Sequence, residues 1–338
     1  MPELLVCGAE GEWALFENTL SATGADDKRR GSVDLTLGDT MFKAFTGTAD
    51  TWVHVRLSGR NTSSGSTGTL QRIIEIRNAS NQLIAGVKCA TVPSGGVFSV
   101  NFVWADSDGG SEVAGSERFS SATTDFVEYD IRIQRSTVTD ANDTLTLSFY
   151  RNSQLRLTQV VTDAGGWSLP GQLQLSYAAS DADYDQVLVQ DVVVSDAVPT
   201  VGMELAVLVP GAVGNYSAFT NNYTNIDDEG YDASTGISTA STGNFESWIF
   251  QTPTFDLGDK VIYAVVLDTV AQLDLAGVVG DFEPLLRIAA TDYSAAAIGA
   301  NNVAPDSYLS IWTQNPATTA PWVEADLTAL EAGVESVV

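Results

Sequence analysis

The stretch TWVHVRLSG, residues 51–59, alternates two kinds of side chain along its whole length. Alternate residues of an extended strand point to opposite faces, so one face here is aliphatic and the other carries Trp52, His54 and Arg56. The aliphatic residues are Val53, Val55 and Leu57. A period of two with one apolar face predicts a strand that covers a hydrophobic core on one side.

The same alternation recurs along the first part of the chain and predicts further strands. They span residues 71–78, 82–92, 96–104, 126–134, 143–152, 171–179 and 185–196. Clusters of Gly, Ser, Asn and Asp separate these segments and are typical of turns. Asn152 and Ser153 stand between two alternating segments, which predicts a tight hairpin. Strands of this length and spacing are typical of an antiparallel sandwich.

The composition and the strand pattern of the sequence change after residue 196. Pro199 marks the predicted domain boundary, and a long segment rich in Asn, Thr, Ser and Gly follows up to Asn244. Strand patterns resume at residues 246–251, 260–275, 284–292 and 307–314. We therefore predict an all-β protein with two jelly-roll or β-sandwich domains, residues 1–197 and 198–338, and one short helix near the end.

The helix is expected within NPATTAPWVEADLTALEAGV, residues 315–334. Two acidic residues suit the positive end of the helix dipole, and Gly333 stands where helices commonly end. An apolar stripe at helical spacing follows. It consists of Leu327, Leu330 and Val334. The pattern predicts a helix near residues 324–332 that packs, together with Trp322, against the last sheet.

The charge balance is strongly acidic, with 43 acidic and 16 basic side chains and a net charge of −27. The excess is greatest in residues 196–338, where the basic residues are Lys260 and Arg287. Such a field repels nucleic acid and anionic lipid. No apolar run approaches the ~20 residues that span a bilayer. We expect neither a nucleic-acid partner nor a membrane association.

The two cysteines, Cys7 and Cys89, do not make a disulfide framework. Buried free thiols are the simpler interpretation, although the two could pair. The beginning of the chain, MPELLVCGAEGEW, lacks the basic segment and the long apolar core of a secretory signal. We expect a protein that stays in the cytosol or leaves by another route, such as a virus particle released by lysis.

The sequence offers few residues for catalysis. His54 is the one histidine, and its place on the polar face of residues 51–59 predicts a surface or rim position. We find no zinc-ligand cluster, no nucleophile motif and no nucleotide-binding loop. A glycoside hydrolase needs only two carboxylates, but the nearest acidic stretches, residues 10–17 and 181–186, do not match the E-x-D-x-x-E pattern. We assign no catalytic, cofactor-binding or metal-binding residue and expect no enzyme, with a jelly-roll hydrolase as the less favoured alternative.

Two kinds of ligand stay open. Residues 106–112, 181–185 and 225–232 are oxygen-rich loops that could bind calcium, although none has EF-hand spacing. A glycan would need exposed aromatic side chains beside polar loops. The candidates are Trp167, Tyr216, Tyr223 and Tyr231.

Residues 184–219 and 307–337, taken together, resemble a family of tailed-bacteriophage structural proteins with an N-terminal concanavalin A-like, or laminin-G-like, jelly roll. The first shared features are Asp185 and Val187 in a strand that closes the jelly roll, and a strand that ends in a turn, matched by Val207-Leu208-Val209-Pro210. The others are the segment from Tyr216 to Asp232 and the ending with Asn315-Pro316-Ala317-Thr318, Pro321-Trp322 and Gly333-Val334. Val323 replaces the usual Thr before the helix, and Gln186 replaces a common second acid.

The resemblance implies a non-enzymatic virion structural protein, made in the host cytoplasm and located on the particle surface. It leaves open whether the protein is a capsid decoration, a head fibre or a tail component. The implied partners are the major capsid protein or tail proteins and further copies of the chain, with a trimer expected. The alternative is a tail-fibre module that recognises a host surface glycan.

Overall fold

The structure is a computed structural model of the whole chain. It describes residues 4–7, 14–15, 22–23, 32–35, 40–60, 71–92, 97–122, 126–136, 143–163, 166–176, 186–203, 205–206, 208–221, 223–226, 236–250, 261–273, 280–300, 306–328 and 330–337. Most of these residues form strands, with one short α-helix, so the predicted all-β class is confirmed. The described residues divide into two compact units, one up to Leu205 and one from Ala206 onward.

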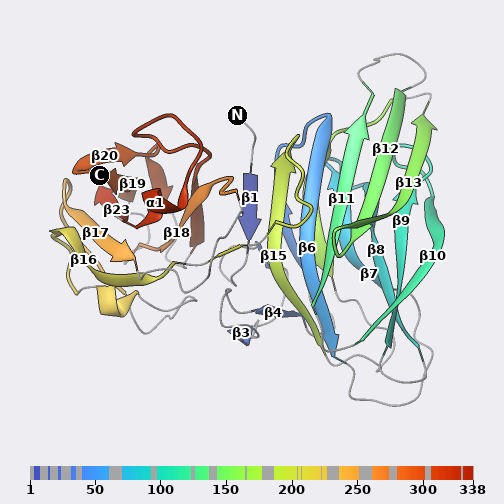
Figure 1. Cartoon of the computed structure of the whole chain (residues 1–338), viewed down its shortest axis with the longest axis horizontal. Helices are drawn as coiled ribbons and strands as arrows, with labels where there is room; N and C mark the ends of the chain where they lie inside the picture. The colour runs from blue at the N-terminus through green and yellow to red at the C-terminus, as the bar shows by residue number, and fades with distance from the viewer. Residues whose placement is uncertain are drawn as a thin grey trace. The chain divides into compact units, whose positions relative to one another are not determined.

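The first unit is a sandwich of two antiparallel sheets (Figure 1). Sheet A runs in the order β13 (Gln154–Asp163), β12 (Asp143–Arg151), β11 (Val127–Arg135), β6 (Asp50–Arg60), β15 (Gln186–Asp196), β4 (Ser32–Leu35) and β3 (Ala22–Thr23), and β1 (Leu4–Cys7) also pairs with β15. Sheet B runs in the order β10 (Glu112–Ala122), β9 (Val97–Ala105), β8 (Leu83–Val92), β7 (Gln71–Asn78), β14 (Pro170–Ser176), β5 (Thr40–Ala44) and β2 (Ala14–Leu15). Cys7 thus lies in sheet A and Cys89 in sheet B.

The core of the first unit lies between the two sheets. The aliphatic side of β6 is buried there, as its alternation predicts. Phe102 of β9 stacks on Phe149 of β12 with ring centroids 4.7 Å apart, so the inner faces of the two sheets are in direct contact. The predicted hairpin at Asn152 and Ser153 is also confirmed, because it joins β12 to β13 and both residues have positive φ, 46° and 61°. Positive φ at two successive residues gives a turn whose twist matches that of the strands.

The second unit also consists of sheets. Its six-stranded sheet, sheet C, has the order β16 (Pro210–Ser217), β17 (Phe245–Phe250), β23 (Glu331–Ser336), β19 (Gly280–Ile288) and β20 (Thr291–Ser294), with β21 (Ile298–Ala300) also on β19. A two-stranded sheet pairs β18 (Val265–Ala271) with β22 (Asp306–Trp312). The core between them centres on Leu286, Trp322, Leu330 and Ala332. A 3-10 turn, η2 (Tyr223–Asn225), follows β16.

The predicted helix near residues 324–332 is wrong in its extent. The helix α1 covers Glu324–Leu327 only, and the chain then enters β23, where Gly333 and Val334 pair with neighbouring strands on both sides. A continued helix would leave the facing edges of β17 and β19 unpaired, so the ladder outweighs the helical pattern. The predicted packing of Trp322 is confirmed, because it is buried and its indole N–H donates to the Trp312 carbonyl at 2.7 Å.

Candidate functional site

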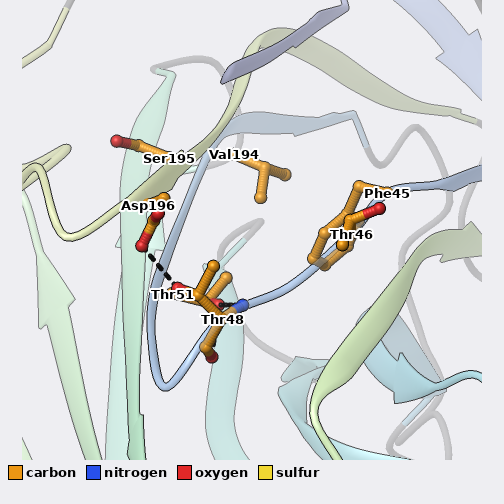
Figure 2. Close-up of a pocket in the computed structure, with 7 residues that line it drawn as sticks. All are labelled: Phe45, Thr46, Thr48, Thr51, Val194, Ser195 and Asp196. Atoms are coloured by element: carbon orange, nitrogen blue, oxygen red, sulfur yellow. Dashed lines mark hydrogen bonds between the residues drawn. The ribbon is translucent and has the colours of Figure 1, made fainter. Parts of the chain in front are cut away.

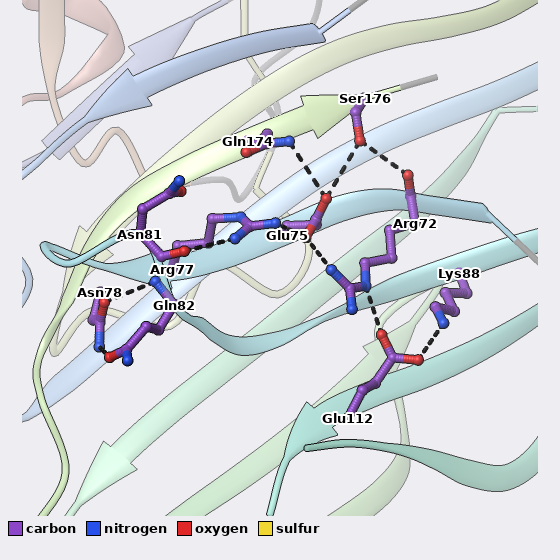
Figure 3. A network of polar contacts seen from close by, with 10 residues as sticks. All are labelled: Arg72, Glu75, Arg77, Asn78, Asn81, Gln82, Lys88, Glu112, Gln174 and Ser176. Atoms are coloured by element: carbon purple, nitrogen blue, oxygen red, sulfur yellow. Dashed lines mark hydrogen bonds and ion pairs between the residues drawn. The ribbon is translucent and has the colours of Figure 1, made fainter. Parts of the chain in front are cut away.

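A network of polar side chains lies on sheet B around Glu75 (Figure 3). Four strands contribute to it, because β7, β8, β10 and β14 each bring polar side chains to the same place. We call this set the Glu75 network. It consists of Arg72, Glu75, Arg77, Lys88, Glu112, Gln174 and Ser176.

Glu75 is the centre of the network and is only 3% exposed. Its Oε2 accepts from Arg72 Nη1 at 3.1 Å and from Arg77 Nη2 at 2.5 Å. Its Oε1 accepts longer hydrogen bonds, both 3.4 Å, from Gln174 Nε2 and Ser176 Oγ. A buried carboxylate is tolerated here because charged and polar donors surround it.

Glu112 carries the network outward to β10. Its Oε2 accepts from Arg72 Nε at 2.5 Å, and its Oε1 contacts the Lys88 ammonium. Burial acts to raise the pKa of Glu112, but the hydrogen bonds from Lys88 and Arg72 outweigh burial and hold the pKa below its usual value. Burial likewise acts to lower the pKa of Arg72, and its contacts with Glu112 and Glu75 outweigh it and raise the pKa. Both groups are therefore charged at neutral pH.

Three cationic side chains thus meet two carboxylates on one sheet of a strongly acidic protein. The contacts among the described residues use Nε and Nη1 of Arg72, whose side chain is 35% exposed. Arg77 is held from the other side, because its Nη1 donates to the Asn81 carbonyl at 2.7 Å. A guanidinium fixed in this way presents donors in a planar arrangement that suits carboxylate or sulfate groups.

His54 does not lie at the surface or rim, so that prediction is wrong. It is fully buried, and its Nδ1 lies 2.7 Å from Asp130 Oδ1 of β11. Thr200, in the chain that follows β15, donates to the same Asp130 oxygen at 2.8 Å and is buried as well. The polar face of β6 is therefore covered by residues that are distant in sequence.

The residue types His54, Asp130 and Thr200 invite comparison with a hydrolase triad. A triad needs the histidine between the acid and the nucleophile. Here both the imidazole and the threonine hydroxyl contact the carboxylate, and all three residues have no exposed surface. The cluster holds the chain after β15 against sheet A and offers a substrate no approach.

A hollow at one end of the first unit is lined by residues of β6, β15 and the segment before β6 (Figure 2). The lining residues are Phe45, Thr46, Thr48, Thr51, Val194, Ser195 and Asp196. Thr48 closes one side by donating from Oγ1 to Asp196 Oδ1 at 2.5 Å. The hollow has room for about one water molecule, far below the roughly 300–1,000 Å³ of small-molecule sites.

The aromatic residues proposed for glycan contact differ in how far they are buried. Trp167 is 2% exposed, so its predicted exposure is wrong. Tyr216 is half-buried in the second unit, where its hydroxyl donates to Asp292 at 2.6 Å and the Arg287 guanidinium lies 5.0 Å from its ring centre. The hydrogen bond to Asp292 and burial raise the pKa of the Tyr216 hydroxyl. Tyr223 is half-buried in η2, and Tyr231 lies outside the described residues.

Of the three proposed calcium loops, residues 106–112 are described. Asp106 accepts from the Ser111 N–H at 2.8 Å, and Asp108 accepts from Asn78 and Ser168. The last residue of the loop, Glu112, belongs to the Glu75 network. Residues 181–185 and most of 225–232 lie outside the described residues. Within the described part of the chain, no three acidic, histidine or cysteine side chains gather closely enough to hold a metal ion.

The Glu75 network is not predicted by any motif in the sequence. A signal was present, because Glu75 and Arg77 alternate with Ile74 and Ile76 within the strand at 71–78. Alternation indicates that these charges share a face, but not that the face is crowded enough to bury a carboxylate.

Comparisons with known proteins add a likeness of fold. No protein-family model matches the chain, and no curated protein matches it. Among solved structures, an alginate lyase matches with a TM-score of 0.37 at 10% identity, over 52% of this chain and 87% of the lyase. The receptor-binding domain of botulinum neurotoxin D matches with a TM-score of 0.34 at 10% identity, over 57% of this chain and 44% of that one. The type G domain matches with a TM-score of 0.31 at 11% identity, over 60% and 43%. Likenesses this weak support no inference about activity or ligand.

No helix in the described ranges is long and apolar enough to cross a membrane.

Proposed function

We propose that this chain is a non-enzymatic structural protein on the surface of a tailed-bacteriophage particle. It serves as a capsid decoration, a head fibre or a tail component, and it resides in the virion after synthesis in the host cytoplasm. Its partners are the major capsid protein or tail proteins and other copies of itself, with a trimer as the expected assembly.

The observation that carries this proposal is the packing role of the segment with the family resemblance, residues 307–337. It supplies β22, α1 and β23, and β23 lies between β17 and β19 in sheet C. Trp322 and Leu330 from this segment belong to the core of the second unit. A signature whose residues hold a fold together fits a building block better than a catalyst. The net charge of −27 suits a protein present in many copies on a particle, because like charge limits aggregation.

Mass spectrometry of purified particles tests the proposal. Copies on the order of hundreds per particle would place the protein on the capsid, and far fewer would place it in the tail. Absence of the protein from purified, infectious particles would overturn the proposal.

A host surface glycan is the second proposed partner, and the Glu75 network is the observation in its favour. Its cations are fixed by neighbouring carboxylates, and Arg72 remains partly exposed. Such a surface suits a glycan that carries carboxylate or sulfate groups rather than a neutral one.

A glycan array probed with the whole chain tests this second proposal. Arg72→Gln should abolish a signal from acidic glycans. The matched control is Arg132→Gln in sheet A, because Arg132 also binds a carboxylate, that of Asp50, with two hydrogen bonds, and its side chain is 30% exposed. A blank array, or equal loss in both variants, would contradict a role for the network in glycan binding.

A further inference from the structure

The strand β13 is an edge strand of sheet A. It pairs with β12 on one side, and no described strand pairs with its other side (Figure 1). An edge strand presents a row of N–H and C=O groups that can pair with another strand. With ten residues, Gln154–Asp163, β13 is a long edge strand.

The side chains that β13 turns away from the core carry no charge. The register with β12 sets Leu155 opposite Tyr150, Thr158 opposite Ser148 and Val160 opposite Thr146. Leu155 and Val160 are each 55% exposed, and Thr158 and Thr162 are exposed as well. The strand thus presents an uncharged stripe of aliphatic and threonine side chains.

The strand β13 lacks most of the features that prevent edge strands from pairing with other chains. Natural edge strands commonly carry charges, proline or bulges. In β13 the register with β12 shifts only near Arg156, at the hairpin end, and pairing is regular from Leu157 to Asp163. The regular part contains neither proline nor lysine, and its one charged residue is at the end.

We propose that β13 pairs with β13 of a second copy of this chain, antiparallel and about a two-fold axis, so that sheet A continues from one copy into the other. The distribution of charge favours a second copy of the chain, in antiparallel orientation, as the partner of β13. The chain carries −27, so two copies repel each other unless they meet at an uncharged surface. The charged residues of β13 are Arg156 near its beginning and Asp163 at its end. Antiparallel pairing brings Arg156 of one copy toward Asp163 of the other, whereas parallel pairing would set like charges together.

Two-fold pairing is self-complementary, because each copy offers the same strand to the other. Leu155 and Val160 would be covered by the other copy's stripe, and backbone N–H and C=O groups on the open side of each strand would pair with those of the other copy. The inference goes beyond the proposed function and does not depend on it, since two copies could pair through β13 whether or not the chain belongs to a phage particle.

Analytical ultracentrifugation of the full chain over a concentration series tests the contact. The variants are Val160→Lys and Val160→Glu, which place a charge of either sign in the stripe. The matched controls are Val323→Lys and Val323→Glu, because Val323 is also 55% exposed but lies in the second unit. Far-UV circular dichroism and the thermal midpoint verify that each variant is folded.

A dimer is expected for the natural chain and for both Val323 variants, or a hexamer of two trimers joined through β13 if the trimer of the proposed function also forms. Both Val160 variants should raise the dimer dissociation constant by about tenfold or more, because each copy would bury a charge in the contact. Val160→Lys also reduces the net negative charge, so its dissociation could not be blamed on general repulsion. A monomer at all concentrations, a trimer that the Val160 variants leave intact, or dissociation caused equally by the Val323 variants would overturn the proposal.

Discussion

The pair formed by His54 and Asp130 allows a sharp test of what holds the first unit together. Both residues have no exposed surface, and Thr200 adds one hydrogen bond to the same carboxylate oxygen. Removing one member of a buried pair is costly, since the other stays buried without its partner. We expect His54→Leu to cost about 3–5 kcal/mol of the free energy of unfolding, because the Asp130 carboxylate keeps only the Thr200 hydroxyl.

The reciprocal variant, Asp130→Leu, should cost less, about 1–3 kcal/mol, because the groups it leaves unsatisfied are an imidazole and a hydroxyl. Apolar residues often replace a buried polar pair at little cost. The double variant, His54→Leu with Asp130→Leu, should therefore be more stable than His54→Leu alone. The coupling between the two sites should be about 2–3 kcal/mol.

Urea denaturation measures these costs, and hydrogen exchange of peptides from β6 and β11 assigns the loss to the first unit. Exchange is needed because two compact units need not unfold together. Additive effects of the two substitutions would refute the reasoning, since they would mean that the residues do not depend on each other. A His54→Leu cost below about 1 kcal/mol would refute it as well, because it would mean that water reaches the carboxylate.

Three further predictions concern the second unit. Trp322→Ala should lower the free energy of unfolding by about 3–5 kcal/mol through the cavity it leaves, whereas Trp322→Phe should lower it by about 1–2 kcal/mol through the hydrogen bond lost to the Trp312 carbonyl. Guanidinium denaturation compares the two variants, and equal losses would contradict the packing of Trp322. Gly333→Ala should destabilise the unit by at least about 1–3 kcal/mol, since its Cβ would lie 2.1 Å from the Glu246 carbonyl oxygen, and an unchanged thermal midpoint would show that the strands can part. Burial raises the pKa of the Glu246 carboxyl despite the Phe219 N–H, so its contribution to stability is present below the unfolded pKa and is lost as pH rises through the folded one. Glu246→Gln should therefore raise the thermal midpoint at about pH 8 and give little gain at about pH 4; a gain that is the same at both would contradict the burial of this carboxyl.

Features that depend on neighbours in sequence could be predicted well. The strand at residues 71–78 is β7 with the same bounds, and the hairpin at Asn152 and Ser153 joins β12 to β13. Alternation and turn residues express the local preferences of the backbone, and no distant residue is needed to recognise them. By contrast, the sequence does not predict β10, because GSEVAGSE in residues 110–117 has little aliphatic alternation and pairs through its backbone with β9.

The candidate site could be predicted only in part. Glu75 and Arg77 could be assigned to one face of a strand from their spacing. Gln174 of β14 contacts Glu75 directly, and Glu112 of β10 joins the network through Arg72. No local pattern in the sequence links those positions to β7. The order of strands in sheet B is what brings the four together.

Alternation and charge can be read residue by residue, so they are enough to predict an acidic all-β protein and the places of many of its strands. The contacts that those strands make depend on the tertiary structure. His54 belongs to a polar face by its spacing, yet Thr200 and Asp130 enclose it. Leu330 and Val334 suit a helix by their spacing, yet Val334 lies in β23, which pairs with β17 and β19. In both cases the deciding partner lies far along the chain, because burial and ladder hydrogen bonds depend on which distant segments meet.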